Sequence, residues 1–447
     1  MIMTPASFNQ QGLWLAHQFD PDTAAYHIPR LFRLFGPLNV NALRSAFQAI
    51  VNRHEILRTT FHFHDGDLVQ RVAEQFPFDL PLIDLTGGAV DDREQRLAAI
   101  ATQETQRRMD LHTGPLMRAA LVRLGAGDHA LLVVMHHMIT DGWSMRILVR
   151  ELRELYRSFV SGLPALLPEL SLQYADFAKW QRKTLTDDVL RPHLDYWRAR
   201  LQGSTPTLPL PGRYSPTAER TAQGRIRYLE ISQEIAEGLR QISRQSGASL
   251  FLTLLAALQV LLGRYAASED VVIGTPVAGR NAVELENLIG YFVNTLVMRT
   301  DLSGNPGFRE LLRRTREVAL EAYTHQDAPF EKIVHQLRAG SGSAGSSPVF
   351  QVMFVLHNSA SELEFEGLRL EEMPVDAGSA KFPMTLEIVE GESLSCSLEY
   401  STDLFEESAI QRLLDNFQRL LSGIVANPDC PIGHLPMLSD AEQRMLI

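Results

Sequence analysis

The chain has 447 residues, of which 45% are hydrophobic, and a formal net charge of −11. A single hydrophobic core rarely extends beyond about 250–300 residues, so this length predicts a globular chain folded into two lobes. The acidic balance argues against nucleic-acid binding, because counterion release requires a basic surface.

The N-terminus lacks a basic segment followed by an apolar one, so no secretion signal is expected. The most apolar stretch, residues 250–262, is too short to span a bilayer and predicts a buried helix. Two isolated cysteines, Cys396 and Cys430, are typical of a reducing compartment. These features favour a cytoplasmic protein that acts without a membrane.

The N-terminal half alternates helical and extended patterns. Apolar residues at helical spacing predict a helix over residues 40–53. Alternation at residues 61–64, followed by Asp-Gly-Asp at 65–67, predicts a hairpin. Residues 130–136 form a buried-strand pattern, and residues 144–159 have the apolar face of a helix.

The C-terminal half has the same mixture, after a stretch rich in Pro, Gly and Ser at residues 203–215 that marks a connection. The segment 340–347, GSGSAGSS, predicts a flexible loop. Residues 438–447 begin like a capped helix and stop, which suggests a domain taken from a longer polypeptide. The remaining patterns predict helices at 250–262 and 308–323 and strands at 271–273, 292–295, 350–356 and 394–400.

The predicted strand at 130–136 ends in two histidines, followed by Asp141 and Gly142. Successive strand side chains point to opposite faces, so we expect His136 and His137 to have different roles unless the backbone turns between them. Ligand spacing for zinc is missing, and Ser144 lacks a nucleophile elbow and is interpreted as a helix N-cap. Two interpretations of the motif remain open: one histidine acts on a bound nucleophile, or both histidines are hydrogen-bonded core residues.

The motif His136-His137-x-x-x-Asp141-Gly142 resembles the HHxxxDG signature of nonribosomal peptide synthetase condensation domains, which chloramphenicol acetyltransferase-like acyltransferases share more loosely. Further segments resemble the other motifs of the family in the same order. They are SFNQQGLW (7–14), RHEILRT (53–59), YADFAKW (174–180), IGYFVNT through Arg299 (289–299) and HQDAPFE (325–331).

Some positions depart from the family pattern. Asn9 and Gly12 differ from the usual first motif, and GSGSAGSS replaces the usual seventh motif. Pro383 stands where an aspartate is usual, in a stretch that the family places near the interlobe cleft, so it could tune substrate shape.

The resemblance implies an α/β (α+β) fold of two chloramphenicol acetyltransferase-like lobes, arranged as a V-shaped pseudo-dimer with a central tunnel. We expect the lobes at residues 1–175 and 176–430, and the start of a linker to an adenylation domain at residues 431–447. No bound cofactor or metal is expected, because substrates arrive on the phosphopantetheine of carrier proteins or as coenzyme A thioesters.

The resemblance also implies site residues. His137 is the expected functional imidazole, which takes a proton from the acceptor amine or holds that amine in position. His136, Asp141 and Gly142 complete the expected catalytic motif; Gly142 is expected to leave room for the turn or the tunnel. Asp141 is expected to be structural and to pair with an arginine, for which the candidates are Arg53, Arg58 and Arg299.

Four more residues are candidate substrate contacts. Asn294 is a possible oxyanion donor, with a structural amide as the alternative. Gln10 and Trp14 could line the cleft or pack in the core, and Trp143 follows the histidine motif.

The implied reaction is amide formation between a carrier-bound aminoacyl amine and an acyl thioester. The expected partners are an acceptor carrier protein, an adenylation domain in cis, and acyl-CoA or a donor carrier protein, with the chain acting as a monomer. Because the first motif begins at Ser7, we favour a chain-initiating domain that N-acylates the first amino acid in lipopeptide biosynthesis. An elongating L-to-L domain and a non-catalytic recruitment platform are the alternatives.

Overall fold

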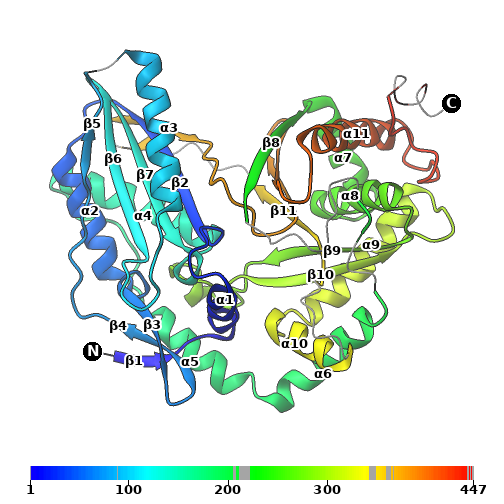
Figure 1. The fold of residues 1–447 in the computed structure, drawn as a ribbon, viewed down its shortest axis with the longest axis horizontal. Coiled ribbons are helices and arrows are strands. Elements are labelled where there is room, and N and C mark those ends of the chain that lie inside the picture. Colours follow the sequence, from blue (N-terminus) through cyan, green and yellow to red (C-terminus); the bar gives the residue numbers. More distant parts are fainter. Residues whose placement is uncertain are drawn as a thin grey trace. The chain divides into compact units, whose positions relative to one another are not determined.

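The computed structural model describes all residues except 1, 88, 205–207, 211–221, 342–348, 359–363, 366, 440–441, 443 and 445–447. The chain divides into two compact units (Figure 1). Unit 1 contains Met1–Val189, Ala278–Val293 and Ala360–Gly378, and unit 2 contains Leu190–Val277, Asn294–Ser359 and Ser379–Ile447.

Unit 1 is built on a six-stranded sheet of order β12-β13-β2-β7-β6-β5 and a three-stranded sheet of order β1-β4-β3. Its strands are β1 (Ile2–Pro5), β2 (His27–Phe35), β3 (Thr59–His64), β4 (Asp67–Val72), β5 (Leu82–Asp84), β6 (Met117–Gly125), β7 (Asp128–His136), β12 (Glu364–Phe365) and β13 (Leu368–Met373). Its helices are α1 (Phe8–Phe19), α2 (Val40–Arg53), η1 (Glu55–Arg58), α3 (Val90–Gln106), η2 (His137–Ile139), α4 (Gly142–Ser161), α5 (Tyr174–Thr184) and η3 (Val283–Leu285).

The core of unit 1 contains the elements that the sequence patterns predicted. Helix α2 has the predicted bounds and buries its predicted face, including Phe47 and Ile50, while β3 and β4 form the predicted hairpin. Strand β7 lies between β2 and β6 with Ala130–Met135 buried. A central strand that is buried on both faces carries a continuous apolar run. In β7 this run is followed by His136, the last residue of the strand, and by His137.

Unit 2 contains the sheet β10-β9-β11-β14-β15-β8, in which β11 is parallel to both of its neighbours. Its strands are β8 (Gly224–Ile231), β9 (Asp270–Val277), β10 (Asn294–Asp301), β11 (Val352–Asn358), β14 (Met384–Glu390) and β15 (Leu394–Ser401). Its helices are α6 (Asp187–Leu201), α7 (Gln233–Gln245), α8 (Leu250–Ala266), α9 (Phe308–Thr324), α10 (Phe330–Ser341) and α11 (Glu407–Ala426).

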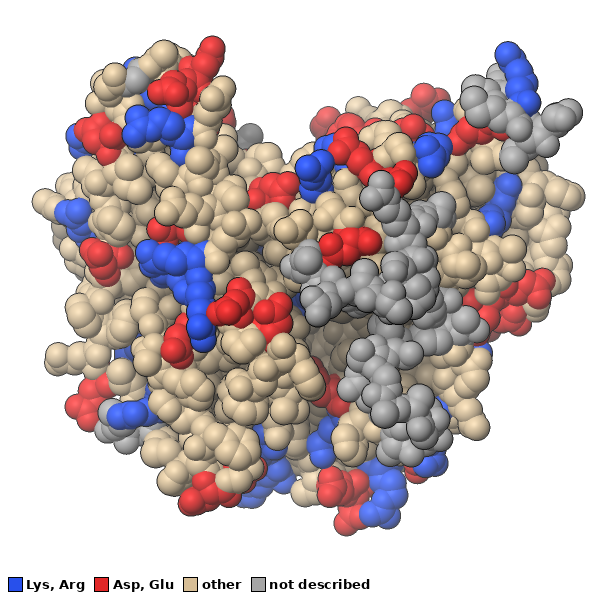
Figure 2. Space-filling view, in the orientation of Figure 1, with Lys and Arg blue, Asp and Glu red and all other residues tan. Residues whose placement is uncertain are grey.

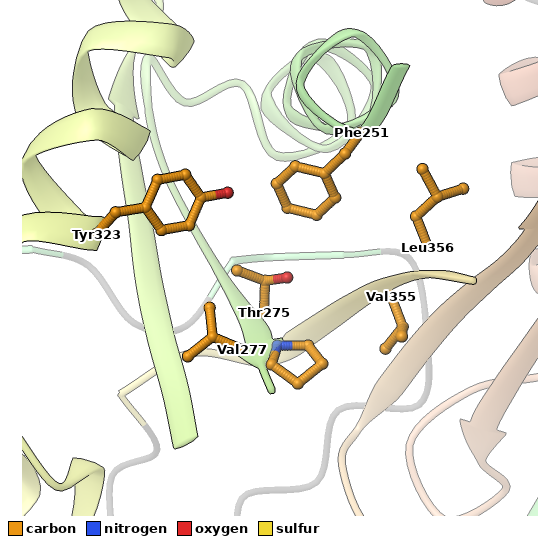
Figure 3. A pocket seen from close by; sticks show the side chains of 7 residues that line it. Phe251, Thr275, Val277, Tyr323, Val355 and Leu356 are labelled. Carbon is orange, nitrogen blue, oxygen red and sulfur yellow. The ribbon is translucent and has the colours of Figure 1, made fainter. Parts of the chain in front are cut away.

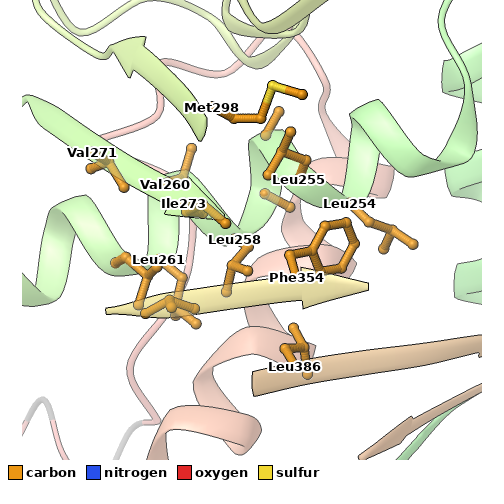
Figure 4. Packing of buried hydrophobic residues seen from close by; sticks show 14 of the residues in the cluster. Leu254, Leu255, Leu258, Val260, Leu261, Val271, Ile273, Met298, Phe354 and Leu386 are labelled. Carbon is orange, nitrogen blue, oxygen red and sulfur yellow. The ribbon is translucent and has the colours of Figure 1, made fainter. Parts of the chain in front are cut away.

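Helix α8 forms the centre of the unit 2 core. Most of its residues are buried, and Leu254, Leu258 and Leu261 pack with Ile273 and Phe354 (Figure 4). An apolar helix of this kind is a core helix when neighbours surround it. Among the described residues, no single helix has the length and apolar content to cross a membrane; only α7 and α8 taken together do, and they are bent by 107° at their junction.

The division into units differs from the predicted lobes. The first break falls after Val189, and two segments of the C-terminal half, 278–293 and 360–378, belong to unit 1. The second segment does so because β13 pairs with β2 in an antiparallel ladder. Residues Ile432 and Leu435 of the predicted linker pack into the unit 2 core.

Two other local predictions change or fall outside the described residues. Strand β10 begins at Asn294, so Phe292 and Val293 precede it. Much of the predicted connection at 203–215, of the loop at 340–347 and of the helix at 438–447 lies outside the described residues. On the surface, Figure 2 shows acidic and basic side chains interspersed over each unit.

Candidate active site

The backbone turns between the two histidines. Strand β7 ends at His136, where the His27 pairing also ends, and the 3₁₀ turn η2 begins at His137. The His137 backbone N–H donates to the Tyr26 carbonyl at 2.8 Å. The two imidazoles have different surroundings within unit 1, and a backbone turn produces this difference rather than the strand alternation from which we expected it.

His137 is half-buried, and its ring is oriented by the loop that follows it. Its Nδ1 lies 2.8 Å from the Thr140 carbonyl oxygen. Because a carbonyl can only accept, Nδ1 carries the hydrogen and Nε2 of the neutral ring carries the lone pair. The Tyr291 ring lies 4.7 Å from the imidazole in an edge arrangement. This tautomer makes Nε2 the basic atom of the site.

His136 is fully buried beside two other histidines of unit 1. Its Nδ1 accepts from the Met138 backbone N–H at 3.1 Å, and its ring meets the edges of the His17 and His27 rings at 5.6 and 5.7 Å. Burial lowers the pKa of both His17 and His27, because it disfavours the charged imidazolium. These contacts place His136 in the core, where it supports the turn that carries His137.

Asp141 caps helix α4. Its side chain is fully buried, and Oδ1 accepts from the Ser144 backbone N–H at 2.7 Å while Oδ2 accepts from the Phe292 N–H at 3.0 Å. The N-cap is therefore Asp141, and the interpretation of Ser144 as the cap was wrong. Ser144 instead bonds Gly290 through its hydroxyl, which donates to the carbonyl at 2.8 Å and accepts from the N–H at 3.0 Å.

The arginine that pairs with Asp141 is Arg280, at 3.3 Å, in a segment of unit 1 that follows β9 in the chain. Arg280 also donates to the Ser144 hydroxyl at 2.7 Å and stacks on the Phe292 ring, 4.0 Å from its centroid. Burial lowers the pKa of Arg280, and Asp141 works against that shift. No spacing signal in the sequence connects Arg280 with the histidine motif, so sequence reasoning missed it.

The three arginines proposed for Asp141 pair elsewhere, which corrects that expectation. Arg53 bonds the buried Glu151, Arg58 lies 3.8 Å from Glu55, and Arg299 forms a two-bond pair with Asp270. Of these three, Arg58 alone pairs within its own segment, whereas Glu151 is 98 residues from Arg53 and Asp270 is 29 residues from Arg299. Motif membership alone could not reveal these partners.

Glu151 is fully buried and shared between Arg53 and His54. His54 Nε2 lies 2.9 Å from Oε2, and Arg53 Nε lies 3.2 Å from the same oxygen. Burial by itself raises the pKa of Glu151, but the bonds from His54 and Arg53 outweigh burial and hold this pKa below its usual range. The RHE segment therefore serves the stability of unit 1.

The described residues show no steric need for glycine in the backbone turn at Gly142, the first of its two expected roles; the second, room for the tunnel, stays a prediction. A Cβ placed on it meets no heavy atom within 4 Å among the described residues, and its φ lies outside the positive range. A side chain at this position would therefore meet open space at the first turn of α4, rather than obstruct the backbone turn.

Three of the expected substrate contacts have partners inside unit 1. Gln10 is fully buried, and its Nε2 donates to the Met138 carbonyl at 3.0 Å, which braces η2. Trp14 stacks on Phe63 at 5.6 Å, and Trp143 donates to the Glu286 carbonyl at 2.9 Å. Their roles toward substrate stay predictions.

Asn294 has its side-chain groups engaged within unit 2. Its Nδ2 donates to the Gln326 and Ala328 carbonyls, both at 2.7 Å, and its Oδ1 accepts from the Phe330 N–H at 3.1 Å. Both amide hydrogens are thus taken. This geometry favours the structural alternative over the oxyanion donor.

The site geometry suits general-base chemistry at one imidazole. In the neutral tautomer, Nε2 of His137 carries the lone pair that can accept a proton. The ring is oriented through Thr140, while Asp141 and Gln10 hold the turn on either side. Within the described part of the chain, no three His, Cys, Asp or Glu side chains are grouped closely enough to hold a metal ion.

A mixed α/β fold that presents an oriented histidine in HHxxxDG defines a chloramphenicol acetyltransferase-like acyltransferase fold. A family model described as a condensation domain matches residues 2–447. This chain belongs to the condensation domain family, of the type found in nonribosomal peptide synthetases. Condensation domains catalyse amide bond formation on substrates that carrier proteins hold by phosphopantetheine.

The chain is similar to one of the linear gramicidin synthase proteins of Brevibacillus parabrevis, with 44% identity over 99% of this chain and 9% of that protein. It is similar in structure to the X-domain in its complex with OxyB from teicoplanin biosynthesis, with a TM-score of 0.87 and 28% identity, covering 98% and 97% of the two chains. A four domain nonribosomal peptide synthetase bound to AMP and glycine shares the fold, with a TM-score of 0.88 and 23% identity, covering 99% of this chain and 34% of that one.

Proposed function

We propose that this chain joins a carrier-bound aminoacyl amine to an acyl thioester. The amine nitrogen attacks the thioester carbonyl carbon, the carbon–sulfur bond breaks, and the phosphopantetheine thiol leaves with a proton. The chain spans only 9% of the length of the gramicidin synthase relative. That a carrier protein and an adenylation domain act with this chain is therefore part of the same proposal. The cytoplasmic location also stays a prediction.

The orientation of His137 carries the proposal. Its Nδ1–H is committed to Thr140, so Nε2 is the atom that accepts the proton or the hydrogen bond of the attacking amine. A positioned base contributes roughly 10²–10⁴-fold to a rate, and alignment of the two reactants contributes at least as much. We therefore expect His137 to matter for rate and not for folding.

Donor identity separates the finer alternatives. A chain-initiating domain takes a fatty acyl group from coenzyme A, whereas an elongating L-to-L domain takes a carrier-bound donor. Two linear gramicidin synthase proteins, each 44% identical to this chain, are compatible with either type. The test is single-turnover mass spectrometry of an aminoacyl-loaded acceptor carrier protein, supplied with an acyl-CoA series or with a carrier-bound donor.

Rapid acylation from coenzyme A alone would support the chain-initiating type. Product only from the carrier-bound donor would support the elongating type. Similarity to an X-domain that forms a complex with OxyB keeps recruitment as the second candidate function. Absence of product from both donors, with the fold intact, would favour recruitment over catalysis.

A further inference from the structure

The sheet of unit 2 splits between two of its strands. Strand β9 pairs with β10 along its whole length, from Asp270 to Val277. Its pairing with β11 covers only Ile273 and Gly274. Pro276 has no N–H to donate, so the β9 ladder cannot continue through it on the β11 side. Thr275 fills part of the gap, since its hydroxyl donates to the Phe354 carbonyl at 2.9 Å.

A pocket of about 140 Å³, lined mostly by apolar and aromatic side chains but exposing backbone and hydroxyl polar groups as well, opens at this split (Figure 3). Its walls are Val277 of β9 and Val355 and Leu356 of β11, and the helices contribute Phe251 and Tyr323. These five side chains are half-buried, so the pocket is open to solvent rather than sealed. Phe251 is braced by the Phe354 ring at 5.4 Å, which gives the pocket a fixed wall.

The lining selects an uncharged group. It contains no ionisable side chain except the Tyr323 phenol, which points toward Phe251 in Figure 3. Burial raises the pKa of Tyr323, so the phenol stays neutral at physiological pH. An engineered cavity of about 150 Å³ binds benzene, so this volume suits about six carbon atoms. Ligand pockets commonly combine hydrophobic and aromatic side chains with a small number of polar groups.

We propose that this pocket binds the apolar side chain or short acyl group of a thioester substrate, of about the size of a leucine or phenylalanine side chain. The inference rests on the proposed function. In the sequence, Arg280, the partner of Asp141, follows Val277 by three residues. The group can come from the donor acyl thioester or from the aminoacyl acceptor, and both have the same chemistry.

The test uses two pocket variants with opposite effects on volume. Leu356→Trp fills the pocket, and Phe251→Ala enlarges it. Leu166→Trp and Tyr228→Ala are matched controls, because both side chains are exposed and Tyr228 is on β8, at the far edge of the sheet. Thermal unfolding of each variant verifies that it is folded.

Single-turnover rates are measured with glycyl, leucyl and phenylalanyl groups, first as donors to a glycyl acceptor and then as acceptors of a glycyl donor. In a hydrophobic pocket, one methylene changes specificity about 10–200-fold. We expect Leu356→Trp to lower the leucyl-to-glycyl rate ratio at least about tenfold in one series, and Phe251→Ala to favour phenylalanyl over leucyl. The series that responds identifies the source of the group. Unchanged ratios in both series would overturn the proposal.

If the wild-type chain forms no amide with any donor, the proposed function fails and the pocket is judged by binding alone. Ligand-observed NMR with the amide analogue of leucyl-pantetheine is the probe. Binding to wild type that disappears in Leu356→Trp would support the pocket. Absence of binding to the wild type, or equal binding to both proteins, would overturn it.

Discussion

Asp141 and Arg280 lie 139 residues apart in the sequence and form a buried ion pair at 3.3 Å. The same carboxylate caps helix α4 and accepts from the Phe292 backbone N–H. One side chain thus ties the loop after the histidines to the segment 278–293. The aspartate of HHxxxDG serves this chain by holding the loop in place, and His137 follows β7 into that loop.

Removal of either partner of this pair should destabilise unit 1. Loss of one member leaves an unpaired buried charge, which costs about 3–5 kcal/mol. We expect Arg280→Met to lower the free energy of unfolding by this amount, measured by urea denaturation. Asp141→Asn should cost a similar amount, because Arg280 keeps an unpaired buried charge and the single amide oxygen cannot accept from both Ser144 and Phe292. Asp22→Asn is the control, because Asp22 is exposed and pairs with Arg108 at the surface; a loss in Arg280→Met no larger than in this control would contradict the account.

Gly142→Ala should be tolerated. The added methyl meets no described atom within 4 Å, and replacement of glycine by alanine at a compatible position stabilises by about 0.4–1 kcal/mol. We expect an unchanged or slightly higher melting temperature and an unchanged single-turnover rate. A folded variant with a rate more than tenfold lower would mean that the space beside Gly142 is occupied by substrate during the reaction.

Gln10 should act as a positioning residue for the turn that carries His137. In Gln10→Leu, the Met138 carbonyl and the Ser7 N–H both lose their partner, at about 1–3 kcal/mol each. Gln10→Glu keeps an acceptor for Ser7, but it replaces the donor to the Met138 carbonyl with an oxygen and places a carboxyl group in a fully buried site. We expect kcat to fall with KM nearly constant in both variants. Equal kcat in the wild type and both variants would mean that Gln10 does not position the turn that carries His137.

The buried histidines beside His136 should make unit 1 sensitive to acid. Burial, aided by Arg108, lowers the pKa of His17 below its usual value of about 6.5, and burial likewise lowers that of His27. Their stabilisation is fully present above pH 6.5 and is lost as the pH falls through the folded-state pKa.

We therefore expect the free energy of unfolding to fall between pH 7.5 and pH 5.5. His17→Leu should reduce this slope by up to about 1.4 kcal/mol per pH unit, because one proton uptake on unfolding is removed. Urea titrations at several pH values measure the slope. An identical slope in wild type and variant would mean that His17 titrates normally in the folded protein.

Hydrophobic patterns and turn residues predicted those helices and strands whose formation depends on residues within one segment. The amphipathic face of α2, the Asp-Gly-Asp hairpin and the apolar run of β7 each follow from residues within one segment. Different roles for His136 and His137 were predicted from strand alternation, whereas the backbone turn between them was named only as the exception and was not predicted.

The hydrophobic periodicity of the sequence does not predict which residues pair over long sequence distances. Nothing in residues 278–293 marks Arg280 as the partner of Asp141, and nothing near Leu368 marks β13 as a partner of β2. The capping role went to Asp141 rather than Ser144 because the helix begins two residues earlier than its apolar face indicates. Asn294 shows the same limit, since its bonds to Gln326 and Ala328 depend on how α9 ends.

The single-turnover rate of amide formation by His137→Ala, compared with wild type, tests the central claim most directly. The account predicts a rate lower by about 10²–10⁴-fold, with a small residual rate from substrate alignment and with an unchanged melting temperature. His137→Ala with a wild-type rate would contradict it, because Nε2 of His137 would then have no part in the transfer.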